Sequence, residues 1–233
     1  MPPLPPRPLI VAAVEAELEP LRRLLAEAKF SAQGGPRWLV TGVGKISAAL
    51  SVEQALSENP ADGVLLVGCA GGYQGQGLEI GDVVVATEDV LADEGVECPE
   101  GFLDLEQLGF SQGEGFGQTL FHVLPVAQPS PEAHARMRAA CSAKGCGLHA
   151  GRLVTVSSGA GTDACARQRT ERWEPLAESL EGAAVALVAA RRGLPCVELR
   201  GISNWTGKRD RSRWQIETAC SNVAVAARAL LEA

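Results

Sequence analysis

The stretch that decides the fold runs from Leu180-Glu181-Gly182-Ala183-Ala184 to Arg200-Gly201-Ile202-Ser203-Asn204. Its first half, from Glu181 to Arg192, is rich in Ala, Val and Leu and is followed by Gly and Pro, which predicts a helix. Its second half, from Cys196 to Ile202, is short and β-prone, which predicts a buried strand. When a helix feeds a parallel strand, its N-terminus lies at the same sheet edge as the strand's carboxyl end, and open α/β sheets bind ligands there. We therefore expect Glu181 and Asn204 to form two walls of a small-molecule site.

The composition favours one α/β domain and argues against a nucleic-acid or membrane protein. The chain has 233 residues, of which 46% are hydrophobic, so one domain over 9–233 can bury a sizeable core after a Pro-rich flexible leader at 1–8. The net charge of −7 disfavours binding to nucleic acid or to a membrane surface, and no apolar run approaches the roughly 20 residues of a membrane span. The seven cysteines and three histidines lack zinc spacing. We expect reduced thiols, a cytoplasmic protein, no metal and no organic cofactor.

Strand-like and helix-like segments alternate along the chain, which predicts an α/β protein, a three-layer α/β/α sandwich with a central mixed sheet. Further strands are expected at 9–14, 38–41, 63–67, 83–87 and 153–157. Further helices are expected at 15–25, 46–58, 131–144, from 163 onward and at 214–231. The acidic segment 88–97 predicts a solvated rim. The segment 98–129 predicts irregular structure, which is typical of a lid or an oligomer contact but also of ordinary packing.

Four of the predicted strand ends carry polar or glycine-rich residues. They are Glu17, the turn at 69–72, the loop at 157–162 and Asn204, and Glu181 lies on the helix between the last two. Each has an ordinary explanation alone, because acids suit a helix N-terminus and glycines suit a tight turn. Their common place at one edge of the sheet indicates a ligand site.

Two glycine-rich segments do not match nucleotide-binding motifs. In Gly42-Val-Gly-Lys45, Leu39 stands where a Walker A motif needs its first glycine, and Ile46 follows the lysine where Ser or Thr is required. Ile80 stands where a dinucleotide fingerprint needs its third glycine. Neither a phosphate loop nor a dinucleotide cofactor is expected.

Six motifs occur in the order and spacing of the nucleoside phosphorylase/nucleosidase family, which the chain resembles over nearly its whole length after the leader. They are Val14-Glu-Ala-Glu17-Leu, Gly42-Val-Gly-Lys45, Gly68-Cys-Ala-Gly-Gly72, Gly81-Asp-Val-Val-Val85, Leu180-Glu-Gly-Ala-Ala184 and Arg200-Gly-Ile-Ser-Asn204. The chain looks most like the branch that holds 5′-methylthioadenosine/S-adenosylhomocysteine nucleosidases and futalosine hydrolases. The resemblance implies a nucleoside phosphorylase-like fold, a small nucleoside substrate, and a homodimer or larger homo-oligomer. Subunits of this family often lend a residue to a neighbour's site, and the aromatic residues within 98–130 are candidates for that role, which the sequence leaves open.

The resemblance also implies one catalytic acid and one substrate-binding acid. Glu17 matches the acid that positions or activates the attacking water, and Glu181 matches the acid that grips the ribose hydroxyls. Breaking a purine N-glycosidic bond builds an oxocarbenium-like ribose and pushes negative charge onto the departing base. Carboxylates stabilise that ribose, hold the sugar in place and orient water.

Other matching residues are implied to border the base. Cys69 stands where a Ser is usual, which puts a hydrogen bond from that hydroxyl in doubt, whereas Ala70 and Gly71 keep the small backbone beside the base. Leu180 precedes the ribose acid in its motif and is expected to contact substrate. Ser158 is expected to contact substrate from a loop that resembles the Thr- and Gly-rich loop of futalosine hydrolases.

Asn204 stands where the adenine-specific nucleosidases have Asp, and it is the second expected catalytic residue. An amide cannot protonate adenine, but it can donate to a carbonyl at C6 and accept from a proton at N7, so it suits hypoxanthine or guanine. The resemblance then implies hydrolysis of futalosine with release of hypoxanthine, a step of an alternative menaquinone pathway. The basic loop of Lys208, Arg209 and Arg211 is either a receptor for the aryl carboxylate of futalosine or simply solvated.

Three alternatives stay open. One is a 5′-methylthioadenosine/S-adenosylhomocysteine nucleosidase with an atypical acid position. Another is a phosphorylase of 6-oxopurine nucleosides, which needs a basic phosphate pocket. The last is a nucleoside-binding protein without catalysis, because Cys69 and Asn204 both depart from the adenine-cleaving pattern.

Overall fold

The computed structural model describes residues 4–5, 7–27 and 37–232. Residues 1–3 and 6 of the expected leader lie outside the described residues, whereas Leu4 packs, partly buried, against the core. The division between a leader and a domain that starts at residue 9 stays a prediction.

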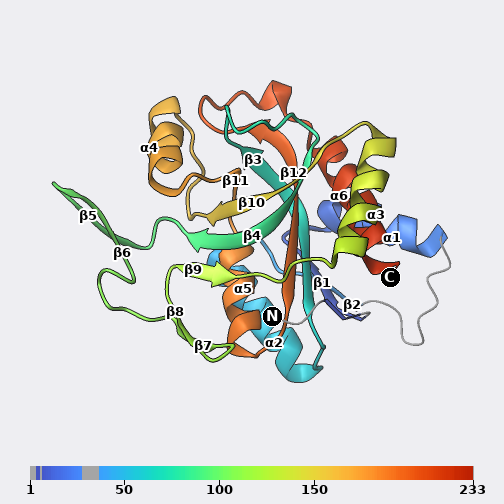
Figure 1. The fold of residues 1–233 in the computed structure, drawn as a ribbon, viewed down its shortest axis with the longest axis horizontal. Helices are drawn as coiled ribbons and strands as arrows, with labels where there is room; N and C mark the ends of the chain where they lie inside the picture. Colours follow the sequence, from blue (N-terminus) through green and yellow to red (C-terminus); the bar gives the residue numbers. More distant parts are fainter. Residues whose placement is uncertain (1–3, 6, 28–36, 233) are drawn as a thin grey trace.

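The main sheet of the described chain has eight strands and is mixed, as predicted (Figure 1). Its order is β11 (Ala177–Ser179), β10 (Leu148–Thr155), β4 (Val83–Leu91), β12 (Cys196–Trp205), β3 (Val64–Gly72), β1 (Leu9–Ala12) and β2 (Arg37–Val40), with β9 (Val123–Pro125) on β4. Neighbours run parallel, except that β4 is antiparallel to β12 and β9, and β11 is antiparallel to β3. Because β11 pairs with both β10 and β3, the strands from β11 to β3 close into a ring.

Helices cover both faces of the sheet, which confirms the three-layer architecture (Figure 1). One layer holds α1 (Glu15–Glu27), α3 (Pro131–Lys144) and α6 (Ile216–Leu231), and the other holds α2 (Lys45–Glu58) and α5 (Gly182–Arg191). Leu21, Met137 and Val223 join the first layer to the sheet. Val52 and Val185 join the second. Within the described ranges, no helix is long and apolar enough to cross a membrane.

Two expectations for the middle of the chain are wrong in part. The segment 88–97 is not a solvated rim throughout, because β4 continues to Leu91 and buries Asp89 between β10 and β9. The segment 98–129 is not irregular throughout. It contributes to two hairpins and to strand β9, the hairpins being β5 (Gly95–Cys98) with β6 (Gly101–Asp104), and β7 (Gly113–Gly115) with β8 (Gln118–Leu120).

The strands that carry the expected site run further than predicted. Residues 69–72 are not a turn but the second half of β3, because they pair with β12 and β11. Strand β12 continues to Trp205, with an irregularity between Ile202 and Asn204. A bulge of this kind redirects the side chain that follows it. The remaining helices are α4 (Asp163–Trp173) and the 3-10 turn η1 (Arg211–Arg213).

Candidate active site

A cavity of about 530 Å³ opens at the carboxyl ends of β1, β3 and β12 and beside the N-terminus of α5. The structure brings seven of the eight expected site residues to its wall, namely Glu17, Cys69, Ala70, Gly71, Leu180, Glu181 and Asn204. Ser158 does not line it. Its side chain is exposed, and the next residues of its loop, Gly159, Ala160 and Gly161, form the wall instead.

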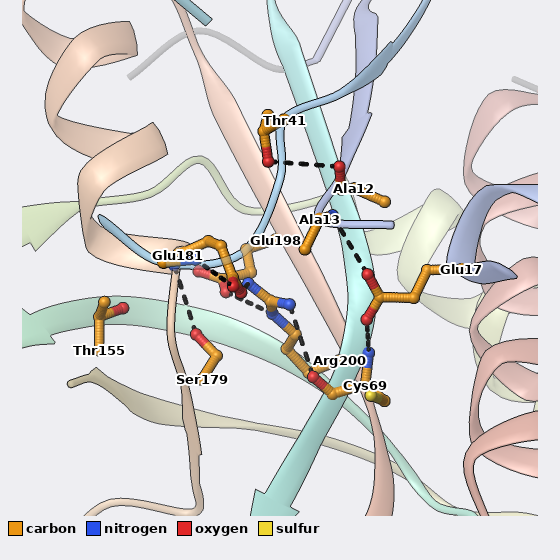
Figure 2. Close-up of polar contacts among 12 residues, drawn as sticks. Ala12, Ala13, Glu17, Thr41, Cys69, Thr155, Ser179, Glu181, Glu198 and Arg200 are labelled. Atoms are coloured by element: carbon orange, nitrogen blue, oxygen red, sulfur yellow. Dashed lines mark hydrogen bonds and ion pairs between the residues drawn. The ribbon is translucent and has the colours of Figure 1, made fainter. Parts of the chain in front are cut away.

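Glu17 is held in one orientation by three backbone donors. Its Oε2 accepts from the N–H of Ala13 at 3.1 Å, and Oε1 accepts from the N–H of Cys69 at 2.9 Å (Figure 2). Oε2 also accepts from the N–H of Val14 at 3.3 Å. The side chain is 6% exposed, whereas Glu15 and Glu19 of the same helix are exposed and pair with arginines. Placement against the helix dipole therefore accounts for the outer two acids. Glu17 instead ties β1 to β3 at the cavity wall.

Cys69 serves the site through its backbone. Its N–H donates to Glu17, and its carbonyl lies 3.5 Å from Nη1 of Arg200. Both groups are present whichever side chain stands at this position. The change from the usual Ser therefore leaves the support of Glu17 in place.

Glu181 occupies the N-cap position of α5 and is 5% exposed. Its Oε1 accepts from the N–H of Gly44 at 3.0 Å, so the Gly-Val-Gly turn that resembles a phosphate loop serves to fix this carboxylate. Gly44 has a φ of 96°, a conformation that favours glycine. The next residue, Lys45, points elsewhere and pairs with Asp93 and Glu94.

Arg200 lies between Glu17 and Glu181 (Figure 2), and sequence reasoning assigned it no role. It is fully buried on β12, with Nε donating to Glu198 Oε1 at 2.8 Å and Nη2 lying 3.7 Å from Glu181 Oε2. Burial opposes its charged form, but Glu198, Glu181 and Glu17 outweigh burial and hold the pKa of Arg200 above its usual value. Nη2 has no hydrogen-bond partner among the described residues and is shielded from solvent.

A sequence signal for Arg200 did exist. Glu198 and Arg200 stand two residues apart in a strand that is otherwise apolar, so their side chains share one face of that strand. Two opposite charges on one face of a buried strand indicate a paired and structured site, because lone buried charges are costly.

The opposite end of the cavity presents an amide and a carboxylate. A Cβ atom on Gly71 would lie 3.4 Å from Asn204 Nδ2 and 3.7 Å from Glu178 Cγ, so both side chains flank this glycine. The Asn204 amide accepts from Ser203 Oγ at 2.8 Å and donates to the Trp205 carbonyl at 3.1 Å. Glycine at position 71 leaves room for a flat ligand between them.

Glu178 is a second residue that sequence reasoning missed. Its Oε1 accepts from the Ala160 N–H at 2.6 Å, and its Oε2 accepts from Tyr73 Oη and Arg169 Nη1, both at 2.7 Å. Burial and Glu178 itself raise the pKa of Tyr73, so the phenol stays a donor. Glu178 lies on β11, a three-residue strand without a periodic pattern, and no sequence signal marks it.

The outer part of the cavity is apolar and basic. The partly exposed side chains of Val14, Val43 and Ile216 line it together with Trp214 and Arg209. The Arg209 guanidinium carbon lies 5.3 Å from the centre of the Trp214 ring. Lys208 lines a neighbouring cavity instead.

Among the described residues, no group of three or more His, Cys, Asp or Glu side chains could hold a metal ion.

Comparison with known proteins identifies the family. Residues 9–233 match the family model of the phosphorylase superfamily. A futalosine hydrolase of Streptomyces coelicolor is 37% identical over 78% of this chain and 72% of its own length, and one of Thermus thermophilus is 33% identical over 83% and 80%. The crystal structure of a 5′-methylthioadenosine/S-adenosylhomocysteine nucleosidase from Neisseria meningitidis superposes with a TM-score of 0.76 at 21% identity, over 98% of this chain and 99% of that chain. The chain belongs to the phosphorylase superfamily.

Proposed function

We propose that this protein hydrolyses the N-glycosidic bond of futalosine and releases hypoxanthine. The relatives named futalosine hydrolase support the substrate. The observation that carries the proposal is the pair of Asn204 and Glu178 on either side of Gly71. The reaction would serve menaquinone synthesis by the futalosine pathway in the cytoplasm.

The base end of the cavity suits a 6-oxopurine better than adenine. Hypoxanthine presents a carbonyl at C6 and an N–H at N1, so an amide donor and a carboxylate acceptor match it. Adenine presents an amino group at C6 and a lone pair at N1, and that lone pair faces the Glu178 carboxylate without a hydrogen. A base of the wrong kind leaves buried polar groups unpaired, which discriminates strongly.

The inner end suits hydrolysis at C1′. Glu181 accepts from a ribose hydroxyl, and the buried Arg200 offsets the negative charge of Glu17 and Glu181 from behind the cavity wall. The water oxygen bonds to C1′ as the bond from C1′ to the purine nitrogen breaks, and the base leaves with the electron pair of that bond. Glu17 takes a proton from the water, while the buried carboxylates stabilise the positive ribose. Asn204 holds the leaving base by hydrogen bonds, and the base takes its proton from solvent.

Product analysis tests the proposal directly. Purified protein is incubated with futalosine, inosine and methylthioadenosine, with and without phosphate, and free base is measured by chromatography. We expect hypoxanthine from futalosine without phosphate, and Glu17→Gln is expected to lower kcat by at least about 100-fold while futalosine still binds. Glu19→Gln, an exposed change on the same helix, is the matched control.

The same assay contains the outcomes that contradict the proposal. Adenine release from methylthioadenosine at a comparable or higher rate would identify an adenine-specific nucleosidase. A requirement for phosphate would identify a phosphorylase, and binding of a 6-oxopurine nucleoside without turnover would identify a binding protein.

The base specificity is expected to change with Asn204. Asn204→Asp replaces the amide donor by a carboxyl group, so futalosine turnover should fall at least about tenfold and some adenine nucleoside should be cleaved. Glu178→Gln should lower the ratio of kcat/KM for futalosine to kcat/KM for methylthioadenosine, because the amide of the new glutamine can donate to adenine N1. The measurement is kcat/KM for both substrates. Unchanged futalosine turnover in Asn204→Asp would refute the assigned role.

We propose that Arg209 binds the aryl carboxylate at the 5′ end of futalosine, with Trp214 beside the aryl ring. Arg209→Ala should raise KM for futalosine about tenfold and leave inosine cleavage unchanged, because inosine lacks the carboxylate. Arg211 also lies near Trp214, at 5.8 Å from its ring centre, but does not line the cavity, so Arg211→Ala is the control. An equal loss with both nucleosides would exclude the proposed contact.

We propose further that the protein is a homodimer that uses α2. Ile46 and Leu50 stand one turn apart on this helix and are 79% and 66% exposed, next to the exposed Val43 at the cavity. Exposed apolar neighbours of this kind mark interaction surfaces. Ile46→Glu should shift the sedimentation coefficient to that of a monomer, whereas Ser142→Glu on α3 should not. A wild-type protein that sediments as a monomer would contradict the proposal.

A further inference from the structure

Two buried carboxyl groups behind the cavity take no part in the proposed reaction. Asp89 on β4 and Glu198 on β12 are both 0% exposed. They meet beneath Gly182, the first residue of α5, where a Cβ atom would overlap Asp89 Oδ2 and Glu198 Oε1 alike. Glycine at this position lets the helix approach a pair of carboxyl groups.

The charges around this pair do not balance if every acid is ionised. Glu17, Glu181, Glu198 and Asp89 are all buried, and Arg200 is the cation that their carboxyl groups surround within the described chain. An uncompensated buried charge strongly destabilises a fold. Protonation of one of these acids therefore stabilises the folded state, because it removes an uncompensated buried charge.

The hydrogen bonds single out Asp89 as the acid that is protonated. The Ala183 N–H donates to Thr155 Oγ1 at 2.7 Å, and that hydroxyl donates to the Asp89 carboxyl group at 3.0 Å. Glu198 Oε1 already accepts from Arg200, while Glu198 Oε2 is buried and receives no hydrogen bond from any described residue. A proton on Asp89 gives the pair a donor, and the Glu198 carboxylate beside it is the acceptor.

The groups that face Asp89 act in different directions, and those that favour its protonated form dominate. They are Glu198, Arg200 and Cys196 on β12, Thr155 on β10 and the N-terminus of α5. Burial and then Glu198 raise the pKa of Asp89 well above its ordinary value, against smaller opposing effects of Thr155 and Arg200. Burial likewise raises the pKa of the Cys196 thiol, which stays neutral.

We propose that Asp89 and Glu198 share one proton, and that this pair, with its single negative charge, is the positioning group that holds Arg200 against Glu17 and Glu181. With both groups protonated, Arg200 would neutralise the two catalytic acids more strongly. With both ionised, the second buried charge would destabilise the fold. The kinetic consequence rests on the proposed hydrolysis, whereas the shared proton does not.

The pH dependence of stability tests the proton. Because the pKa of Asp89 is higher in the folded state, the folded protein binds more protons than the unfolded chain, and stability falls as pH rises above about 4 until the folded pKa is passed. Asp89→Asn, which mimics the protonated acid, should remove this fall in the unfolding temperature. At neutral pH, infrared spectra should show the carbonyl stretch of a protonated carboxylic acid in the wild type and not in Asp89→Asn. An unchanged slope or an absent band would overturn the shared proton.

Kinetics test the positioning of Arg200. In Glu198→Gln, Asp89 can ionise and restore the single charge, so kcat should fall only about tenfold. The double variant Asp89→Asn with Glu198→Gln cannot restore it, and kcat should fall at least about tenfold beyond the product of the two single effects, with a smaller change in KM. Additive effects would contradict the positioning role.

The stability and infrared measurements test the shared proton independently of the kinetic measurements, so failure of the shared proton can be told from failure of the proposed hydrolysis. If the double variant does not fold, the slope and the infrared band of Asp89→Asn still decide the shared proton. If the wild type does not cleave futalosine, the same two measurements still stand, and only the proposed hydrolysis fails.

Discussion

The buried guanidinium of Arg200 is the interaction on which the rest of the site depends. It is the positive group around which Glu17, Glu181 and Glu198 converge, and those acids come from α1, the start of α5 and β12. Buried carboxylates would repel one another without it. The elements that supply them pack closely at this edge because one cation, with backbone donors from Ala13, Gly44 and Cys69, satisfies them together.

Backbone geometry then gives the cavity its two different ends. The inner acids are fixed by main-chain N–H groups, which stay in place when side chains move. The base end depends on β11, which pairs with both β10 and β3 and so brings Glu178 beside Gly71. The irregularity of β12 before Asn204 breaks the alternation of its side chains, so Ser203 can support the Asn204 amide. The inner end gathers several carboxylates around Arg200, whereas the other end presents one carboxylate beside an amide.

The sequence was sufficient for the parts of the site that depend on element order alone. A helix start and a strand end that follow one another in a parallel sheet must share an edge, so Glu17, Glu181 and Asn204 could be brought together without coordinates. The pair of Asp89 and Glu198 beneath Gly182 could not be predicted in this way. It requires β4 and β12 to be antiparallel neighbours, and nothing in their order along the chain implies that pairing. Glu178 was missed because β11 is short, and its place comes from pairing rather than from periodicity. The prediction of a turn at 69–72 was wrong because strand pairing decides the structure there as well. Glycines that favour a turn can also extend a strand that has partners on both sides.

The distribution of charge also bears on which nucleophile the cavity admits. With the ribose placed as proposed, phosphorolysis would bring a phosphate dianion to C1′ beside the carboxylates of Glu17 and Glu181, where Arg200 is engaged by Glu198. The carboxylates of this wall repel an incoming phosphate. The low dielectric of a buried site strengthens that repulsion. Water carries no charge and meets no such barrier, while the positive ribose of the transition state is stabilised by the same field. The acids that exclude phosphate are thus the acids that favour bond cleavage. Among the basic residues of the 208–211 loop, Arg209 lines this cavity, at its outer end and away from these carboxylates.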